Sequence, residues 1–171
     1  MDKKLESWLE KHNINYKLYT HPAVFTVPEA KIHSGHISGS HCKNLLLKNK
    51  KSGQLYLVTI PYDKNLDLKE FRKMISAPKV RFAGEEELSE VLGITPGAVS
   101  PLGLINDKDN KVIFWIEQNL WNSELICCHP NVNTETLQIP NEDFHRLIKA
   151  TGNQYSIKND LPILNQNFTS I

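Results

Sequence analysis

Helix-like and strand-like segments follow one another irregularly along this chain, and their order is the strongest constraint on its fold. A strict alternation of strand and helix would predict a parallel α/β sheet, whereas an irregular mixture predicts an α+β fold. The strand-like runs are 14–19, 43–47, 54–60, 80–82, 125–128 and 135–139, and 104–105 with 112–116 read as a hairpin. We therefore expect one α+β domain with a mixed or antiparallel sheet.

Capping residues predict where the helices begin and end. Asp2 is a good N-cap for a first helix with Leu5 and Leu9 on one face. Thr26 and Glu29 stand three residues apart and form a capping box for a second helix. Further helices are expected after Asp67, from 85 to Gly93 and over 141–151, and residues 33–41 are expected to form a mobile connection.

Length and charge narrow the class of protein. The 171 residues suit a single domain, which we place at 1–155, followed by a C-terminal tail at 156–171 where periodicity is lost. No apolar run approaches the roughly 20 residues of a membrane span, and no signal peptide is visible, so we expect a soluble, cytoplasmic protein. The net charge of +1 gives no global basic field, so any RNA contact must come from a local patch.

Motifs for common enzyme classes and metal sites are missing. There is no P-loop, G-x-G-x-x-G, G-x-S-x-G or H-E-x-x-H, which argues against an ATPase, a dinucleotide enzyme and an α/β-hydrolase. Histidines at 33, 36 and 41 precede Cys42, but a zinc site usually needs a second pair of ligands. Cys127 and Cys128 are adjacent on a predicted strand and do not supply it. We expect reduced thiols, no metal and no cofactor.

Three features leave a structural and a functional interpretation open. Lys43 opens an apolar strand, where it either meets solvent or reaches a pocket as a phosphate, carboxylate or carbonyl ligand. His129 ends a strand before Pro130, either as a strand terminus or as a pocket-rim residue able to relay a proton, and His21 precedes a proline in the same way. The basic clusters are either solvated surface or an RNA contact; they comprise Lys48, Lys50 and Lys51, then Lys69, Arg72 and Lys73.

An ordered set of short motifs is spread over roughly residues 5–150. The motifs include Tyr19-x-His21-Pro22-x-x-Phe25-Thr26-x-x-Glu29-Ala30, Lys43-Asn44-Leu45-x-Leu47-Lys48, Pro96-Gly97-Ala98-Val99-Ser100-Pro101 and His129-Pro130-x-x-Asn133-Thr134. In this order they resemble the YbaK-like family of prolyl-tRNA-synthetase-associated editing domains. The resemblance implies a mixed, largely antiparallel β-sheet or barrel flanked by helices. It also implies hydrolysis of wrongly charged aminoacyl-tRNA.

The resemblance further implies a branch, partners and site residues. The Lys43-Asn44 segment is closer to the free-standing, trans-acting branch that clears alanine from tRNA(Pro). The implied partners are the acceptor end of tRNA(Pro) and prolyl-tRNA synthetase, with a monomer and no membrane association expected. The catalytic residues would be Lys43 and His129. The substrate-binding residues would be His21, Phe25, Thr26, Asn44, Cys128 and Pro130, and the RNA-binding residues Lys48, Lys50 and Lys51.

Cys128 departs from the small residue that relatives often carry before the histidine, which bears on the amino-acid preference of the pocket. An aminoacyl ester is already activated, so a positioned water and oxyanion stabilisation can suffice without a nucleophile triad. The alternative to a deacylase is a non-catalytic binding or regulatory module of the same fold. Replacing Lys43 with alanine distinguishes them, because only the enzyme would lose turnover.

Overall fold

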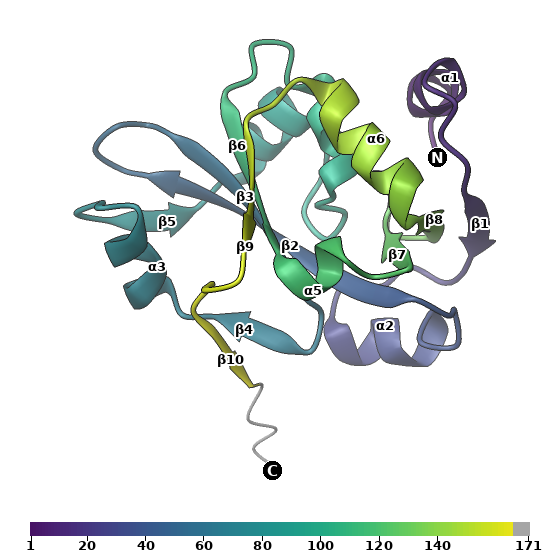
Figure 1. Ribbon diagram of the computed structural model, residues 1–171, viewed down its shortest axis with the longest axis horizontal. Coiled ribbons are helices and arrows are strands. Elements are labelled where there is room, and N and C mark those ends of the chain that lie inside the picture. Colours follow the sequence, from purple (N-terminus) through teal and green to yellow (C-terminus); the bar gives the residue numbers. More distant parts are fainter. Residues whose placement is uncertain (166–171) are drawn as a thin grey trace.

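A mixed β-sheet organises the protein in a computed structural model that describes residues 1–165 (Figure 1). Its strand order is β1-β8-β7-β2-β3-β6-β9, with β5 paired to β2. The long strand β2 pairs antiparallel with β3 and β5 but parallel with β7. The bounds are β1 Lys17–Thr20, β2 Ser40–Asn49, β3 Leu55–Pro61, β5 Val80–Phe82, β6 Val112–Glu117, β7 Leu125–Cys128, β8 Glu135–Pro140 and β9 Tyr155–Lys158. The predicted α+β class and mixed sheet are confirmed.

Helices flank this sheet, and their caps follow the predicted signals. The bounds are α1 Lys3–Lys11, α2 Val27–His33, α3 Leu68–Met74, α4 Glu85–Glu87 with a π-helical continuation Leu88–Leu92, α5 Gln118–Trp121 and α6 Asn141–Thr151. The Asp2 side chain accepts the Leu5 N–H, and Thr26 with Glu29 forms a complete capping box. Gly93 and Gly152 adopt positive φ at the C-caps, which glycine reaches without strain.

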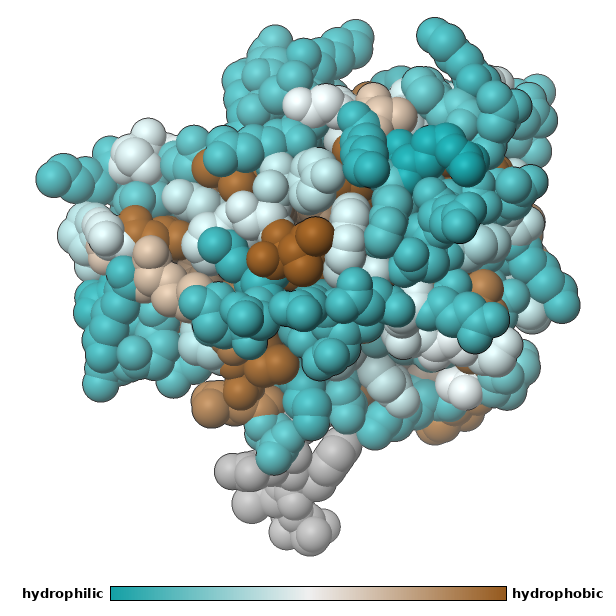
Figure 2. Space-filling view, viewed as in Figure 1, coloured by the Kyte–Doolittle hydropathy of each residue, from teal (hydrophilic) through white to brown (hydrophobic). Residues whose placement is uncertain are grey.

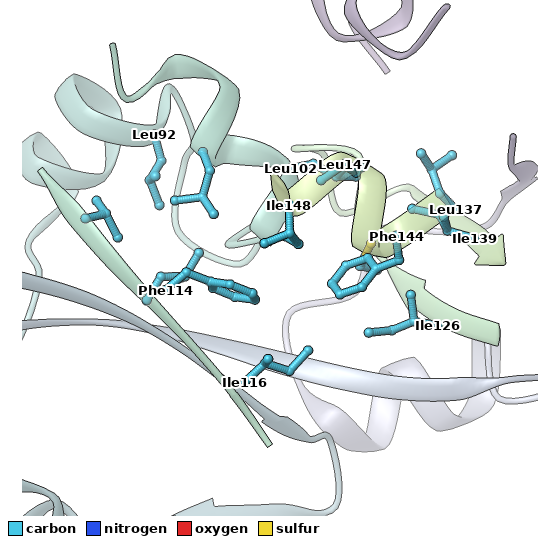
Figure 3. Close-up of a cluster of buried hydrophobic side chains, with 14 of the residues drawn as sticks. Leu92, Leu102, Phe114, Ile116, Ile126, Leu137, Ile139, Phe144, Leu147 and Ile148 are labelled. Atoms are coloured by element: carbon cyan, nitrogen blue, oxygen red, sulfur yellow. The ribbon is translucent and has the colours of Figure 1, made fainter. Parts of the chain in front are cut away.

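Two apolar clusters lie on opposite faces of the sheet. Phe114 and Ile116 of β6 face Phe144 and Ile148 of α6 in the larger cluster (Figure 3). Trp115 belongs to the second cluster, which α3 covers. Because successive side chains of a strand point to opposite faces, β6 supplies both clusters and is buried on both sides.

The hairpin predicted from 104–105 and 112–116 is wrong. Residues Pro101–Asn106 form a 3-10 helix, whose first turn Ser100 caps with its hydroxyl. Asp107 accepts the N–H groups of Lys111 and Val112, and this turn directs β6 into parallel pairing with β3 and β9. The turn signal was present, but the partner strand lies far away in the sequence.

The tail predicted at 156–171 also requires correction. Residues 155–158 form β9 on the edge of the main sheet, beside β6. Ile163–Asn165 form β10, which pairs antiparallel with β4 (Lys64–Leu66) as a separate two-stranded ribbon. Such short strands lack a detectable sequence period and are specified by pairing with distant residues. Residues 166–171 of the predicted tail lie outside the described residues.

The surface of the described chain is mixed in character. On the face shown in Figure 2, apolar side chains gather over the β4–β10 ribbon, where Leu164 is 53% exposed. Among residues 1–165, no helix has the length and apolarity needed to cross a membrane.

Candidate functional site

A cavity of about 260 Å³ lies at the junction of β2 and β7. The loop before α2, α2 itself, the loop at 97–99 and the end of β7 complete its wall. Six of the eight residues that the resemblance assigned to catalysis or substrate binding line it: Phe25, Thr26, Lys43, Asn44, Cys128 and His129. The parallel pairing of β2 with β7 explains this convergence, since it places Ser40 and His41 beside Ile126 and Cys127.

His129 follows the end of β7 and is oriented by the neighbouring strand β8. Its Nδ1 lies 2.8 Å from the backbone oxygen of Glu135, in β8. A carbonyl only accepts, so Nδ1 carries the proton and the neutral ring keeps a lone pair on Nε2. Burial lowers the pKa of His129, a shift that the Glu135 hydrogen bond opposes and the nearby His21 and His41 reinforce. The arrangement therefore favours a neutral imidazole able to accept a proton.

His21 supports this corner but lies outside the lining of the cavity. Its Nε2 is 2.9 Å from the Thr136 hydroxyl, and its ring centroid is 6.0 Å from that of His129. The backbone N–H of His21 also donates to the backbone oxygen of Thr134. Pro130 is buried beyond the end of β7 and does not line the cavity either. His21 and Pro130, which were predicted to bind substrate, therefore lie behind the cavity wall.

Lys43 is half-buried at the cavity edge, where β2 begins to cross the second cluster. Its Nζ donates to Asn65 Oδ1 at 2.8 Å, which tethers the ammonium to β4. Burial lowers the pKa of Lys43, and the carboxylate of Asp63 opposes that shift. An ammonium has three donors, so the contact with Asn65 leaves further protons for an anionic or carbonyl oxygen.

Asn44 lines the cavity, and both ends of its side-chain amide are bound within the protein. Its Nδ2 donates to the Val99 oxygen at 3.0 Å, and its Oδ1 accepts from the Thr59 hydroxyl at 2.6 Å. Thr59 is fully buried and is the cross-strand neighbour of Asn44 in β3. Asn44 therefore clamps the 97–99 loop onto β2.

The loop containing Gly97 and Val99 belongs to the Pro96–Pro101 motif, which the sequence did not assign to the site. Gly97 has φ of +89°, and a Cβ there would lie 3.2 Å from Phe25 Cδ1. Phe25 is 70% exposed, unusual for a phenylalanine, and lies at the mouth of the cavity. The Pro96-Gly97 pair, a turn signal, was the feature that could have identified this contact.

Helix α2 covers the cavity but has no buried residue of its own. Its start is fixed by Glu29, whose carboxylate accepts the N–H groups of Phe25 at 2.7 Å and Thr26 at 3.1 Å. The bond from Phe25 lowers the pKa of Glu29. Thr26 accordingly caps the helix by accepting the Glu29 N–H, and Glu29 holds the backbone of Phe25 in place.

All three cysteines line the cavity as free thiols. Burial raises the pKa of Cys42 to about 12 and that of Cys127 to about 12, and the pKa of Cys128 is raised well above its usual value. A protonated thiol is a poor nucleophile, so these residues shape the wall. In the described part of the chain, no three His, Cys, Asp or Glu side chains converge as metal ligands.

The predicted RNA-binding lysines lie at the other end of β2. Lys50 is seven residues beyond Lys43, about 23 Å along a strand. Lys48 is bound to Glu87, which also binds Arg81. Lys50 and Lys51 are exposed in the β2–β3 turn. The structure separates this cluster from the cavity.

Comparisons with known proteins agree on one family. The aminoacyl-tRNA editing domain matches residues 21–147. Prolyl-tRNA editing protein ProX of Acetoanaerobium sticklandii is 35% identical over 147 residues, which cover 86% of this chain and 90% of ProX. Prolyl-tRNA synthetase associated domain-containing protein 1 of Danio rerio is 37% identical over 151 residues, covering 87% of this chain and 82% of that protein.

A solved structure provisionally assigned as a trans-editing enzyme for prolyl-tRNA synthetase shares the fold. It superposes with a TM-score of 0.68 at 21% identity, covering 92% of this chain and 97% of that one.

Proposed function

Because the chain belongs to the aminoacyl-tRNA editing domain family, of the YbaK-like type, we propose that it is a trans-acting deacylase of mischarged tRNA(Pro), with Ala-tRNA(Pro) as its preferred substrate. The observation that carries this proposal is the convergence of Lys43 and His129 on one small cavity. The family match and ProX, a relative named as a prolyl-tRNA editing protein, support the class of substrate.

The reaction is hydrolysis of the ester that joins the amino acid to the terminal ribose. A water oxygen attacks the ester carbonyl carbon, the bond to the ribose oxygen breaks, and the ribose oxygen leaves with a proton. His129 Nε2 would accept the proton of the attacking water and return it to the ribose oxygen. The Lys43 ammonium would stabilise the developing oxyanion or hold the terminal nucleotide.

Selectivity for alanine would come from steric exclusion. Phe25, Val27 and Ala30 close the cavity from the side of α2, and the buried thiol of Cys128 limits it from the side of the sheet. A rigid apolar wall distinguishes substrates by about 1–3 kcal/mol per methylene, and rejects a larger ring more strongly when the two overlap. Exclusion of proline therefore requires that the proline ring overlap this wall when its ester lies beside Lys43 and His129.

Single-turnover hydrolysis of Ala-tRNA(Pro), with Pro-tRNA(Pro) and Cys-tRNA(Pro) alongside, tests the proposal. We expect rapid loss of the alanyl ester alone. Loss of the cysteinyl ester would keep the enzyme class and overturn the size argument. Survival of all three esters at high enzyme concentration would favour the non-catalytic module.

Two variants test the roles of the residues. Lys43→Ala should abolish turnover in a folded protein, and Lys149→Ala, an exposed lysine on α6, removes the same charge as a control. His129→Asn keeps a donor for the Glu135 oxygen but has no Nε2, so a loss of about 10²–10⁴-fold identifies a proton acceptor. Full activity of His129→Asn would reduce His129 to a residue that shapes the loop.

A further inference from the structure

We propose that Asn65 is a positioning residue for Lys43, and that strand β10 holds Asn65 in the required place. Its predicted effect on deacylation rests on the proposed function, whereas its effect on the lysine does not. Neither Asn65 nor any residue of β10 was singled out by the sequence patterns. The segment that matches the editing-domain family ends at residue 147, so β10 lies outside it.

The contact itself is direct. Lys43 Nζ donates to Asn65 Oδ1 at 2.8 Å, across the gap between the main sheet and the β4–β10 ribbon. Lys43 carries a long side chain with many rotamers, and a fixed acceptor restricts where its ammonium lies. Asn65 therefore selects an ammonium position at the cavity edge before any substrate binds.

Strand β4 has only three residues and depends on β10 for its own position. Leu164 of β10 is the register partner of Asn65. The side chain of Lys64 donates to Asn165 at 2.7 Å, and the N–H of Asp67 donates to the Pro162 oxygen at 2.7 Å. These contacts lie on both sides of Asn65 in the sequence. Figure 1 shows β4 and β10 side by side. A two-stranded ribbon is marginal by itself, so loss of β10 would release β4.

The charge of the acceptor matters as much as its place. The titratable groups around Lys43 are Tyr62 and Asp63 in the β3–β4 turn, Lys64 beside Asn65, His41 and Cys42 on β2, and Cys127, Cys128 and His129 at the end of β7. Asp63 already favours the ammonium, while burial disfavours it. A neutral amide orients the ammonium without neutralising it, whereas a carboxylate at residue 65 would form an ion pair and compete with the substrate.

Titration of Lys43 in the full chain tests this without reference to activity. The ¹³Cε signal of Lys43 in lysine-labelled protein, assigned with Lys43→Ala, is followed against pH in the wild type, Asn65→Leu and Asn65→Asp. We expect the Lys43 midpoint to move to lower pH in Asn65→Leu, which removes the acceptor, and to higher pH in Asn65→Asp. Asn122→Leu and Asn122→Asp, at an exposed asparagine outside the cavity lining, should leave it unchanged.

Strand β10 is tested by Leu164→Pro, which disrupts the pairing with β4, against Leu164→Ala, which keeps the backbone. Leu164→Pro should shift the Lys43 midpoint in the same direction as Asn65→Leu, and Leu164→Ala should not. Single-turnover deacylation at neutral pH should fall about 10–100-fold in Asn65→Leu and Asn65→Asp. Far-ultraviolet circular dichroism confirms that each variant is folded.

An unchanged Lys43 midpoint in folded Asn65→Leu and Asn65→Asp would overturn the proposal. Shifted midpoints with undiminished deacylation would also overturn it, because the contact would then position nothing that the reaction uses. If the midpoints move as expected but the wild type hydrolyses no ester, the contact stands and the proposed function fails.

Discussion

Replacing Asn44 with alanine should destabilise the protein by about 2–4 kcal/mol. The variant leaves the fully buried Thr59 hydroxyl without its acceptor, and a buried unsatisfied polar group costs about 1–3 kcal/mol. It also removes the donor to the Val99 oxygen, a hydrogen bond worth about 1 kcal/mol net. With a urea m-value of about 2 kcal/mol/M, the unfolding midpoint should fall by about 1–2 M.

Urea denaturation followed by tryptophan fluorescence measures this loss. Thr59→Val alone should cost about 1–2 kcal/mol, and the double variant should cost less than the sum, because both single changes break one hydrogen bond. Asn122→Ala, at an exposed asparagine, is the matched control and should stay within about 0.5 kcal/mol of wild type. Two results would refute the clamp: an Asn44→Ala variant as stable as the control, or losses of unfolding free energy that are strictly additive in the double variant. Asn44 would then contribute to substrate contact alone.

Three further predictions concern the surroundings of the cavity. Gly97→Ala should lower the free energy of unfolding by about 1–2 kcal/mol, because residue 97 has a positive φ. The added Cβ should also displace Phe25 and slow deacylation by more than the loss of stability explains. Equal deacylation rates for variant and wild type would contradict this. Hydrogen bonds from Arg81, then Lys48, lower the pKa of Glu87 to about 2 from 4.5, so Glu87→Gln should cost about 1–2 kcal/mol at pH 7. That difference should be lost as the pH falls from about 4.5 towards 2, as thermal unfolding at several pH values would show. Burial raises the pKa of Cys42 and Cys127 to about 12, which keeps both thiols protonated at pH 8. An aromatic disulfide reagent at pH 8 should therefore modify them about 1000-fold more slowly in the folded protein than in urea. Rapid modification of the folded protein would contradict the burial of these thiols.

Local patterns in the sequence predicted the local parts of the fold. The Asp2 cap, the capping box of Thr26 and Glu29, and the helix end at Gly93 depend on residues within one helical turn, and all three are confirmed. The parallel pairing of β6 with β3 joins residues more than fifty positions apart. Such pairing depends on burial and on neighbouring strands, which a window of ten residues does not contain.

In the candidate site, too, local motifs identified some residues and missed those that lie far away in the sequence. Lys43 and His129 were identified from motifs, and the cavity brings them together. The partners that orient them come from other elements: Asn65 from β4 and the backbone of Glu135 from β8. Neither partner carries a recognisable motif, because an amide or a backbone oxygen becomes specific only through its position.

The pairing of β4 with β10 also bears on the synthesis of the chain. Asn65 and its register partner Leu164 are separated by nearly a hundred residues, so β4 is synthesised well before the strand β10 that pairs with it. A nascent chain that has emerged from the ribosome through residue 147 already holds the whole segment matched to the editing family, yet β4 still lacks its pairing with β10. The ammonium of Lys43 would therefore reach its final position only after β10 has left the exit tunnel, so the site would mature later than the segment matched to the editing family.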